Sequence, residues 1–319
     1  MWIRSVEVRG LRDLPGQRLD VEPGAVSIAG PDPASTALFD ALELAFAAVA
    51  GASLLPLLRR VGAATAASEA SAPGELNLLD PAGLRDWLAP GQQSLSVTLR
   101  LALDPQLHAK LRSAASADPR VALALADDPT LSLVVGAVAT TDHSALAVSL
   151  QRLDLGAEAL WAPEAERPRW QRALLSALGE RLARAPGPDP LGALRAAQRG
   201  RAGFGAYTRW TSALLPAGPR LRLAEDADGA PLLLGDELPL RRFGAAALRR
   251  AELAAAAVLS GADVLLVEGD DPLLLPLLEG EGACLEQALC AAGGPPLQAL
   301  AAPPGARQAR ALPFARSSA

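Results

Sequence analysis

Two short segments far apart in the chain carry residue types that could bind a phosphate group and a divalent cation. The first is a glycine–proline turn at 30–33 followed by two hydroxyl residues, and the second is an acidic group that follows the apolar run 262–267. Backbone amides of a glycine-rich turn can cradle phosphate, and hydroxyl and carboxylate oxygens ligate Mg²⁺. The candidate residues for such a nucleotide site are Gly30, Ser35, Thr36, Glu268, Asp270 and Asp271.

Other side chains that commonly catalyse reactions or bind metals are few. Cys284 and Cys290 have no histidine near them in the sequence, so no metal site is expected, and we interpret them as buried thiols on a helix. His108 and His143 have no nucleophile at a recognisable spacing, which favours surface or turn positions. The acidic group 268–271 has an alternative interpretation as the solvated cap of a helix at the end of a strand.

The elements that must position these residues can be predicted from the spacing of apolar residues. Alternating polar and apolar residues are typical of strands, and apolar residues three or four apart are typical of helices. The strands expected are 2–10, 18–29, 94–103, several within 120–155, a hairpin at 220–234 and a buried parallel strand at 262–267. The helices expected are 35–50, 81–88, 168–185 and 243–260. Ser35 or Thr36 is expected to cap the first helix, and most of 51–93 is expected to be a loose excursion.

Segments at both ends of the chain resemble ATPase heads of the ABC, SMC and RecF type. The stretch 38–43 is similar to the helix that follows the phosphate-binding loop of these heads, and 262–278 aligns without gaps on their second nucleotide-binding motif. A third segment, just before the helix expected at 243–260, lies where the family has its signature loop. Its residues are Arg241, Arg242, Phe243 and Gly244.

This resemblance implies an α/β fold with a P-loop NTPase core, an antiparallel β lobe and helical insertions. It implies a single head over 1–319, with N-terminal lobe elements at 1–50, a variable middle at 51–219 and a signature-containing lobe at 220–319. No segment sustains a heptad pattern, so coiled-coil arms are not expected.

Several positions that the family uses for ATP chemistry hold other residue types in this sequence. In the alignment, Ser35 takes the place of the phosphate-binding lysine and Thr36 that of the hydroxyl that ligates Mg²⁺, while Lys110 is the only lysine of the chain. Glu268 takes the metal-liganding position. Gly269 stands where the family has its catalytic glutamate, and a glycine cannot polarise water.

The remaining motifs are also altered. Asp270 or Asp271 could replace the missing glutamate only from a displaced position, and the segment 297–304, which aligns with the family's switch histidine, contains no histidine. Gly244 is retained in the signature-like segment, but alanines follow it. These departures predict a non-hydrolysing pseudo-ATPase with no cofactor and no bound metal, and weak residual binding of Mg²⁺ or nucleotide stays open.

The family's heads act as face-to-face dimers, so the resemblance also implies a protein partner. The expected role is a structural or regulatory subunit that pairs with an active homologous ATPase, an effector subunit or a second copy of itself. Arg241 and Arg242 are the best candidates for the partner contact. The alternative is an unconventional ATPase acting in DNA repair or genome defence. It requires an arginine near Gly30 in place of the lysine, and Arg4 or Arg12 could supply it only if the first strand lies close.

Charge and hydropathy limit the other partners. A net charge of −5 gives no support for binding to a nucleic-acid backbone, although it does not exclude a local basic patch. The apolar run 41–50 is too short to span a membrane, and the first residues alternate in polarity unlike a signal peptide. The sequence therefore predicts a cytoplasmic protein.

Overall fold

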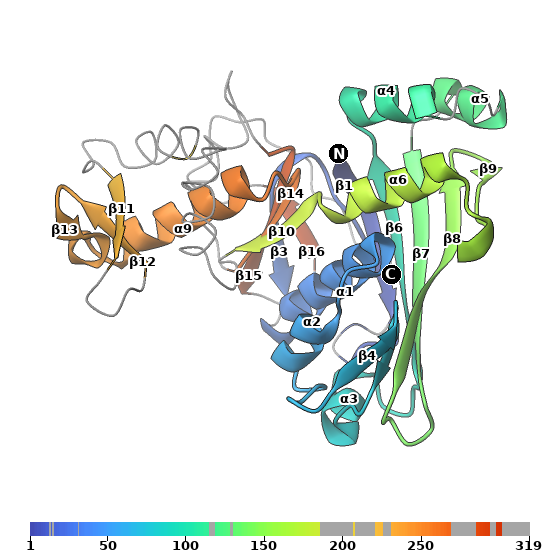
Figure 1. Cartoon of the computed structure of the whole chain (residues 1–319), viewed down its shortest axis with the longest axis horizontal. Coiled ribbons are helices and arrows are strands. Elements are labelled where there is room, and N and C mark those ends of the chain that lie inside the picture. Colours follow the sequence, from blue (N-terminus) through green and yellow to red (C-terminus); the bar gives the residue numbers. More distant parts are fainter. Residues whose placement is uncertain are drawn as a thin grey trace.

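The computed structural model describes residues 1–12, 14, 16–30, 32–114, 119–127, 130–185, 207, 221–225, 231–268, 285–293 and 298–301. Within these ranges the chain forms a mixed α/β fold with two main sheets and a smaller third sheet (Figure 1). The predicted α/β class with an antiparallel β lobe is therefore confirmed. Each helix in the described ranges is too short or too polar to cross a membrane.

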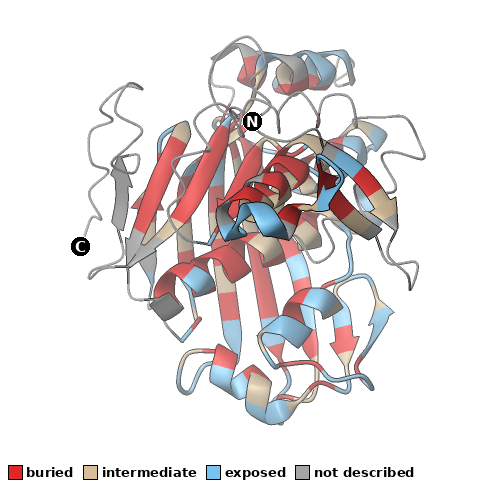
Figure 2. Ribbon diagram, turned by 90° about the vertical axis from the view of Figure 1, so that its left-hand side faces the viewer, coloured by how far each residue is buried: buried red, intermediate tan, exposed pale blue. Residues whose placement is uncertain are grey.

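The first sheet is antiparallel and has the strand order β2-β1-β6-β7-β8-β5-β4, with β9 paired to β8. Its strands are β1 (Trp2–Arg9), β2 (Gln17–Asp20), β4 (Glu69–Ala72), β5 (Glu75–Asn77), β6 (Ser94–Ala102), β7 (Thr130–Ala139), β8 (Leu146–Leu155) and β9 (Glu158–Ala159). Alternate residues of β6, such as Leu95, Val97 and Leu99, are buried because successive side chains of a strand point to opposite faces. One face of this sheet therefore packs into the core (Figure 2).

The second sheet has the strand order β10-β14-β15-β3-β16. Its strands are β3 (Gly24–Gly30), β10 (Leu182–Ala185), β14 (Val264–Val267), β15 (Gln287–Gly293) and β16 (Gln298–Ala301). The first four in spatial order are parallel, and β16 is antiparallel to β3. All four residues of β14 are buried, as its unbroken apolar run predicts for a parallel strand. The carboxyl ends of β3, β10, β14 and β15 meet at one edge, which we call the carboxyl edge.

The helix α1 (Asp32–Ala50) lies between the two main sheets and contacts β3 and β15 on one side and β6, β7 and β8 on the other. Its residues are apolar nearly all round, and Leu38, Phe39 and Leu42 are almost fully buried. A helix with this composition has to be covered on most of its surface. The helix α6 (Arg169–Gly179) packs beside it (Figure 1).

The other helices are α2 (Leu55–Arg60), α3 (Pro81–Trp87), α4 (Pro105–Ala114), α5 (Pro119–Asp127) and α9 (Ala245–Leu259), with 3-10 turns η1 (Glu164–Glu166) and η2 (Leu240–Phe243). The helix α9 packs with the third sheet, β11 (Leu221–Glu225), β12 (Pro231–Gly235) and β13 (Leu238–Pro239), around a second apolar core. In the described ranges the longest helix is α1, with 19 residues, and no coiled-coil arm is present.

Polar side chains join the two main sheets at the amino ends of the parallel strands. Gln287 is fully buried, and its amide group donates to the backbone oxygens of Ile3 and Glu22 and accepts from the backbone nitrogen of Ile3. Arg181 donates to both carboxylate oxygens of Asp263 at 2.9 Å. These bonds anchor the end of the parallel sheet opposite the carboxyl edge.

Three predicted elements were wrong. The helix expected at 81–88 is present as α3, but the rest of 51–93 is not a loose excursion, because β4 and β5 extend the antiparallel sheet and α2 is helical. The residues 119–127 form α5 instead of a strand, since Val121, Ala124 and Leu125 share one buried helical face. The helix predicted at 168–185 ends at Gly179, and 182–185 pairs with β14 as β10. The sequence also indicates a helical stretch after 186–190 that runs to about residue 215, and apart from Tyr207 this stretch lies outside the described residues.

Candidate functional site

The turn between β3 and α1 is much shorter than a phosphate-binding loop requires. The strand β3 ends at Gly30 and the helix begins at Asp32, so only Pro31 separates them. A P-loop places four residues between its two glycines and uses their backbone amides to cradle phosphate. A cradle of that kind does not fit into a one-residue connection.

The position of this turn also corrects the predicted helix start. Ser35 and Thr36 lie inside α1 and cannot cap it from outside, because the helix begins at Asp32 rather than near residue 35. Pro33 in the first turn explains this start, since a residue at a helix N-terminus needs no intrahelical donor. The Ser35 side chain is 3% exposed, whereas Thr36 is exposed.

Glu268 directly follows β14 and lies at the carboxyl edge, as predicted, but its carboxylate is engaged by an arginine. Arg184 on the neighbouring strand β10 donates from Nε and Nη2 to Oε1 of Glu268, the Nε bond being 3.2 Å long. Arg249 on α9 donates to the backbone oxygen of Glu268. The Glu268 carboxylate therefore already has a cationic partner.

Arg184 also reaches α1. Its Nη1 donates to Oδ1 of Asp40 at 2.7 Å and lies 3.7 Å from Oε1 of Glu43, and its guanidinium stacks 5.8 Å from the ring centre of Phe39. The side chains of Arg184 and Asp40 are only 10% and 6% exposed. Burial alone would lower the pKa of Arg184, but its hydrogen bonds to Glu268 and Asp40 raise that pKa above its ordinary value. Arg184 is thus a permanent buried cation.

A second arginine completes the group. Arg60 on α2 donates to Oδ1 of Asp40 at 2.9 Å and also pairs with Glu43. We call these five residues, Asp40, Glu43, Arg60, Arg184 and Glu268, the carboxyl-edge cluster. Its two cations and three carboxylates tie β10, β14, α1 and α2 together. Among them, sequence reasoning found only Glu268, because Arg184 and Asp40 are 144 positions apart.

The signature-like segment lies just before α9, as predicted. Gly244 caps this helix with a φ of 100°, a left-handed conformation that favours glycine. Arg242 and Phe243 are exposed, Phe243 by 42%, while nothing is described of the Arg241 side chain. Arg249, which contacts Glu268, follows Gly244 by five residues, or about 7.5 Å along the helix.

Asp270 and Asp271 lie outside the described residues. Arg12 pairs with Asp86 at 3.0 Å, and Arg4 stacks over Trp2, so neither takes the place of the missing lysine.

Three further predictions concerned the cysteines, the histidines and the segment 297–304. Cys290 is buried on strand β15 rather than on a helix, and Cys284 lies outside the described residues. His143 occupies the turn between β7 and β8, as expected. Within the segment 297–304, which was aligned with the switch position, residues 298–301 form β16 alongside β3. No group of metal-binding side chains occurs in the described ranges.

Comparisons with known proteins give similarity of architecture only. No family model matches the sequence, and no curated protein is significantly similar to it. A structure of the SmcHead bound to the C-winged helix domain of ScpA is 12% identical, with 91% of this chain and 90% of that chain covered and a TM-score of 0.48. The Smc head domain with an extended coiled coil bound to the C-terminal domain of ScpA, derived from Pyrococcus furiosus, is 9% identical, with 92% and 90% covered and a TM-score of 0.47.

The recombination mediator protein RecF with ATPrS is 11% identical, with 92% of each chain covered and a TM-score of 0.40. At these values the similarity assigns neither a family nor the role of any residue. The chemistry of the carboxyl edge therefore has to be argued from its own contacts.

Proposed function

We propose that this protein is a non-hydrolysing pseudo-ATPase that serves as a structural or regulatory subunit built on an ATPase-head-like fold. The observation that carries the proposal is the pairing of Arg184 with Glu268 and Asp40 at the carboxyl edge. Open parallel sheets bind ligands beyond the carboxyl ends of their strands, so this is where a nucleotide would be expected. Here the guanidinium group of Arg184, in place of a bound metal ion, is the cation that pairs with the carboxylates.

The residues at this edge do not fit Mg·ATP. The one-residue connection between β3 and α1 leaves no loop of amides for the phosphates. Oε1 of Glu268 accepts from Arg184, and the positive charge of this arginine beside the carboxylate disfavours a second cation there. The sequence also lacks a lysine and a catalytic glutamate at the matching positions. We therefore expect no hydrolysis and no tight nucleotide binding.

Calorimetry tests this proposal directly. Titration of the protein with millimolar ATP and Mg²⁺ is expected to give no saturable heat. The rate of phosphate release from ATP is expected to equal the rate in buffer without protein. Saturable binding that Thr36→Ala or Glu268→Ala weakens would overturn the proposal, because those residues would then still form a nucleotide site.

The partner surface proposed is the exposed segment at the start of α9. Arg242 and Phe243 project from η2 beside the glycine cap, and an exposed aromatic residue next to an arginine is a typical interface anchor. The partner would be an active homologous ATPase, an effector subunit or a second copy. Light scattering tests the last of these: a dimer should dissociate in Arg242→Glu and not in Arg85→Glu, an exposed arginine on α3. Pairing with a second head would be contradicted if the protein is monomeric and if no active head-type ATPase is encoded beside its gene.

The second candidate function is an unconventional SMC/RecF-type ATPase in DNA repair or genome defence. One observation favours it: Arg184 brings a guanidinium to the carboxyl edge, although β14 and β15 lie between its strand and β3. Its nitrogens already donate to Glu268 and Asp40, which favours the structural role. If this alternative holds, ATP hydrolysis is measurable and Arg184→Met abolishes it, whereas Arg60→Met reduces it little.

A further inference from the structure

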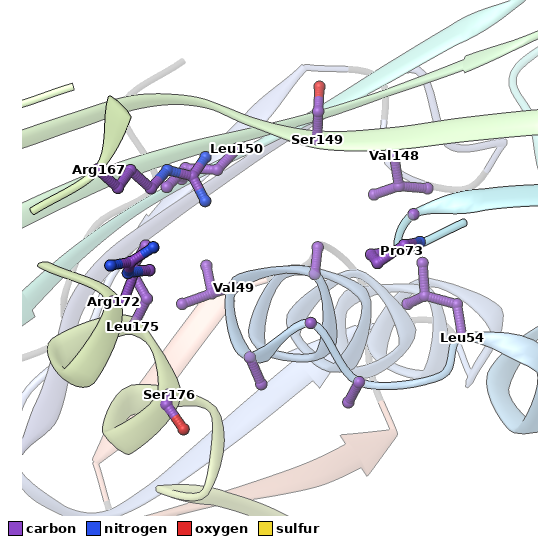
Figure 3. Close-up of a pocket in the computed structure, with 15 residues that line it drawn as sticks. Val49, Leu54, Pro73, Val148, Ser149, Leu150, Arg167, Arg172, Leu175 and Ser176 are labelled. Atoms are coloured by element: carbon purple, nitrogen blue, oxygen red, sulfur yellow. The ribbon is translucent and has the colours of Figure 1, made fainter. Parts of the chain in front are cut away.

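A pocket of about 260 Å³ lies at the C-terminal end of α1 (Figure 3). It is bounded by the last turn of α1, the following segment 51–54, the turn at 73–74, the strand β8 and the helix α6. The carboxyl-edge cluster uses Asp40 and Glu43 in the middle of α1, and the two sites share no residue. The proposed function makes no use of this pocket.

Most of the residues that line the pocket are apolar, although polar atoms make up the larger share of its exposed surface. The apolar residues include Val49, Leu54, Val148, Leu150 and Leu175, each of them less than 10% exposed. The helices α1 and α6 approach closely at Gly179, where an added Cβ would lie 2.0 Å from Cβ of Ala50. The pocket opens beside this close contact, between the two helices and β8.

Two arginines supply the only charges among the described residues that line the pocket. Arg167 precedes α6 and Arg172 lies in its first turns, and their guanidinium groups lie on the same side of the pocket (Figure 3). In the described part of the chain neither forms an ion pair, and Glu166, next to Arg167 in sequence, pairs with neither. This differs from Arg60, Arg181 and Arg184, all of which bind carboxylates.

The geometry of Arg167 favours ligand binding over a freely moving surface side chain. Its Nε donates to the backbone oxygen of Ala162 at 3.2 Å, which holds one edge of the guanidinium and leaves Nη1 and Nη2 to the pocket. Two like charges on one wall repel each other unless an anion lies between them. Guanidinium groups also match the paired oxygens of carboxylates and phosphates.

We propose that this pocket binds a small ligand that carries a carboxylate or phosphate group on a short apolar chain. Arg167 and Arg172 bind the anionic group, and Val49, Leu54 and Val148 pack against the chain. The volume lies just below the range of about 300–1,000 Å³ that is usual for ligand pockets, which restricts the occupant to a short chain.

Calorimetric titration of the full chain with hexanoate, hexyl phosphate and inorganic phosphate tests the proposal. We expect saturable binding of hexanoate, hexyl phosphate or both with a dissociation constant below about 1 mM, and much weaker binding of inorganic phosphate, which lacks the chain. The stronger of the two hexyl compounds identifies the anionic group. Hexylamine should not bind. Absence of saturable binding by both hexyl compounds up to about 10 mM would overturn the proposal.

Variants locate the binding. Arg167→Gln and Arg172→Gln should each weaken binding about tenfold or more, since a hydrogen bond to a charged group is lost. Arg169→Gln is the matched control, because this exposed arginine starts the same helix and does not line the pocket. Ser176→Phe should block the apolar chain while leaving both arginines in place. Equal binding by all four variants would contradict the assignment.

Discussion

Two sites along α1 involve arginines in opposite situations. In the middle of the helix, Arg184 and Arg60 direct their donors to Asp40 and Glu43, and Arg184 also binds Glu268. At its last turn, Arg167 and Arg172 face an apolar pocket that has no carboxylate among its described lining residues. Paired arginines hold elements of the fold together, whereas unpaired ones beside a pocket can bind a ligand. The difference separates a structural site from a candidate binding site within one helix length.

The largest expected effect is on the carboxyl-edge cluster. Arg184→Met leaves Asp40 with Arg60 alone and Glu268 without its side-chain cation, so the free energy of unfolding should fall by about 2–3 kcal/mol, as measured by urea denaturation. The control is Arg60→Met, whose side chain is 42% exposed and whose loss should cost about 1 kcal/mol or less. Equal losses in the two variants would mean that the burial of Arg184 does not increase its contribution to the free energy of unfolding.

The next effect concerns the contact that shapes the pocket. Gly179→Ala places a Cβ 2.0 Å from Cβ of Ala50 and 2.9 Å from its Cα, so α6 must move away from α1. Overpacking of this kind should lower the free energy of unfolding by about 1–2 kcal/mol. The double variant Ala50→Gly with Gly179→Ala should recover part of the loss, because it removes the Cβ that clashes. Purely additive losses would show that the two residues do not press on each other.

A smaller effect is expected at the exposed member of the cluster. The Glu268 side chain is 56% exposed, and in Glu268→Gln the amide oxygen can still accept a hydrogen bond from Arg184. We therefore expect a loss of about 1 kcal/mol or less in urea denaturation. Calorimetry on the same variant should still give no ATP binding. A loss as large as that of Arg184→Met would make Glu268, instead of Asp40, the main partner of Arg184.

Local patterns in the sequence predicted much of the fold. The apolar run 262–267 predicted the buried strand β14, and the alternation over 94–103 predicted β6, because both patterns report burial of neighbouring side chains. The start of α1 was also encoded, since proline favours the first turn of a helix, but 30–33 was interpreted as a turn and the helix was therefore expected to begin near Ser35. The strand β10 was missed because it continues the apolar spacing of the helix before it.

The candidate sites were less predictable because their residues come from distant segments. Glu268 was found from its place after a strand, whereas Arg184 gains its role only when β10 pairs with β14 and lies over α1. The pocket gathers residues of α1, β8, α6 and a turn, and nothing in the local sequence distinguishes Arg172 from surface arginines such as Arg169. Which charges find partners is decided by tertiary packing.

The smallest expected effect on stability is at the pocket, and it gives the comparison its sharpest test. Arg167→Gln and Arg172→Gln remove no ion pair present in the described residues and relieve repulsion between two cations, so each should change the free energy of unfolding by less than about 0.5 kcal/mol in urea denaturation. Addition of hexyl phosphate should stabilise the unmodified chain and stabilise these variants less, because a ligand that binds only the folded state raises its stability. A loss above about 1 kcal/mol without ligand would show that the arginines support the fold, and the contrast between the pocket and the carboxyl-edge cluster would then no longer hold.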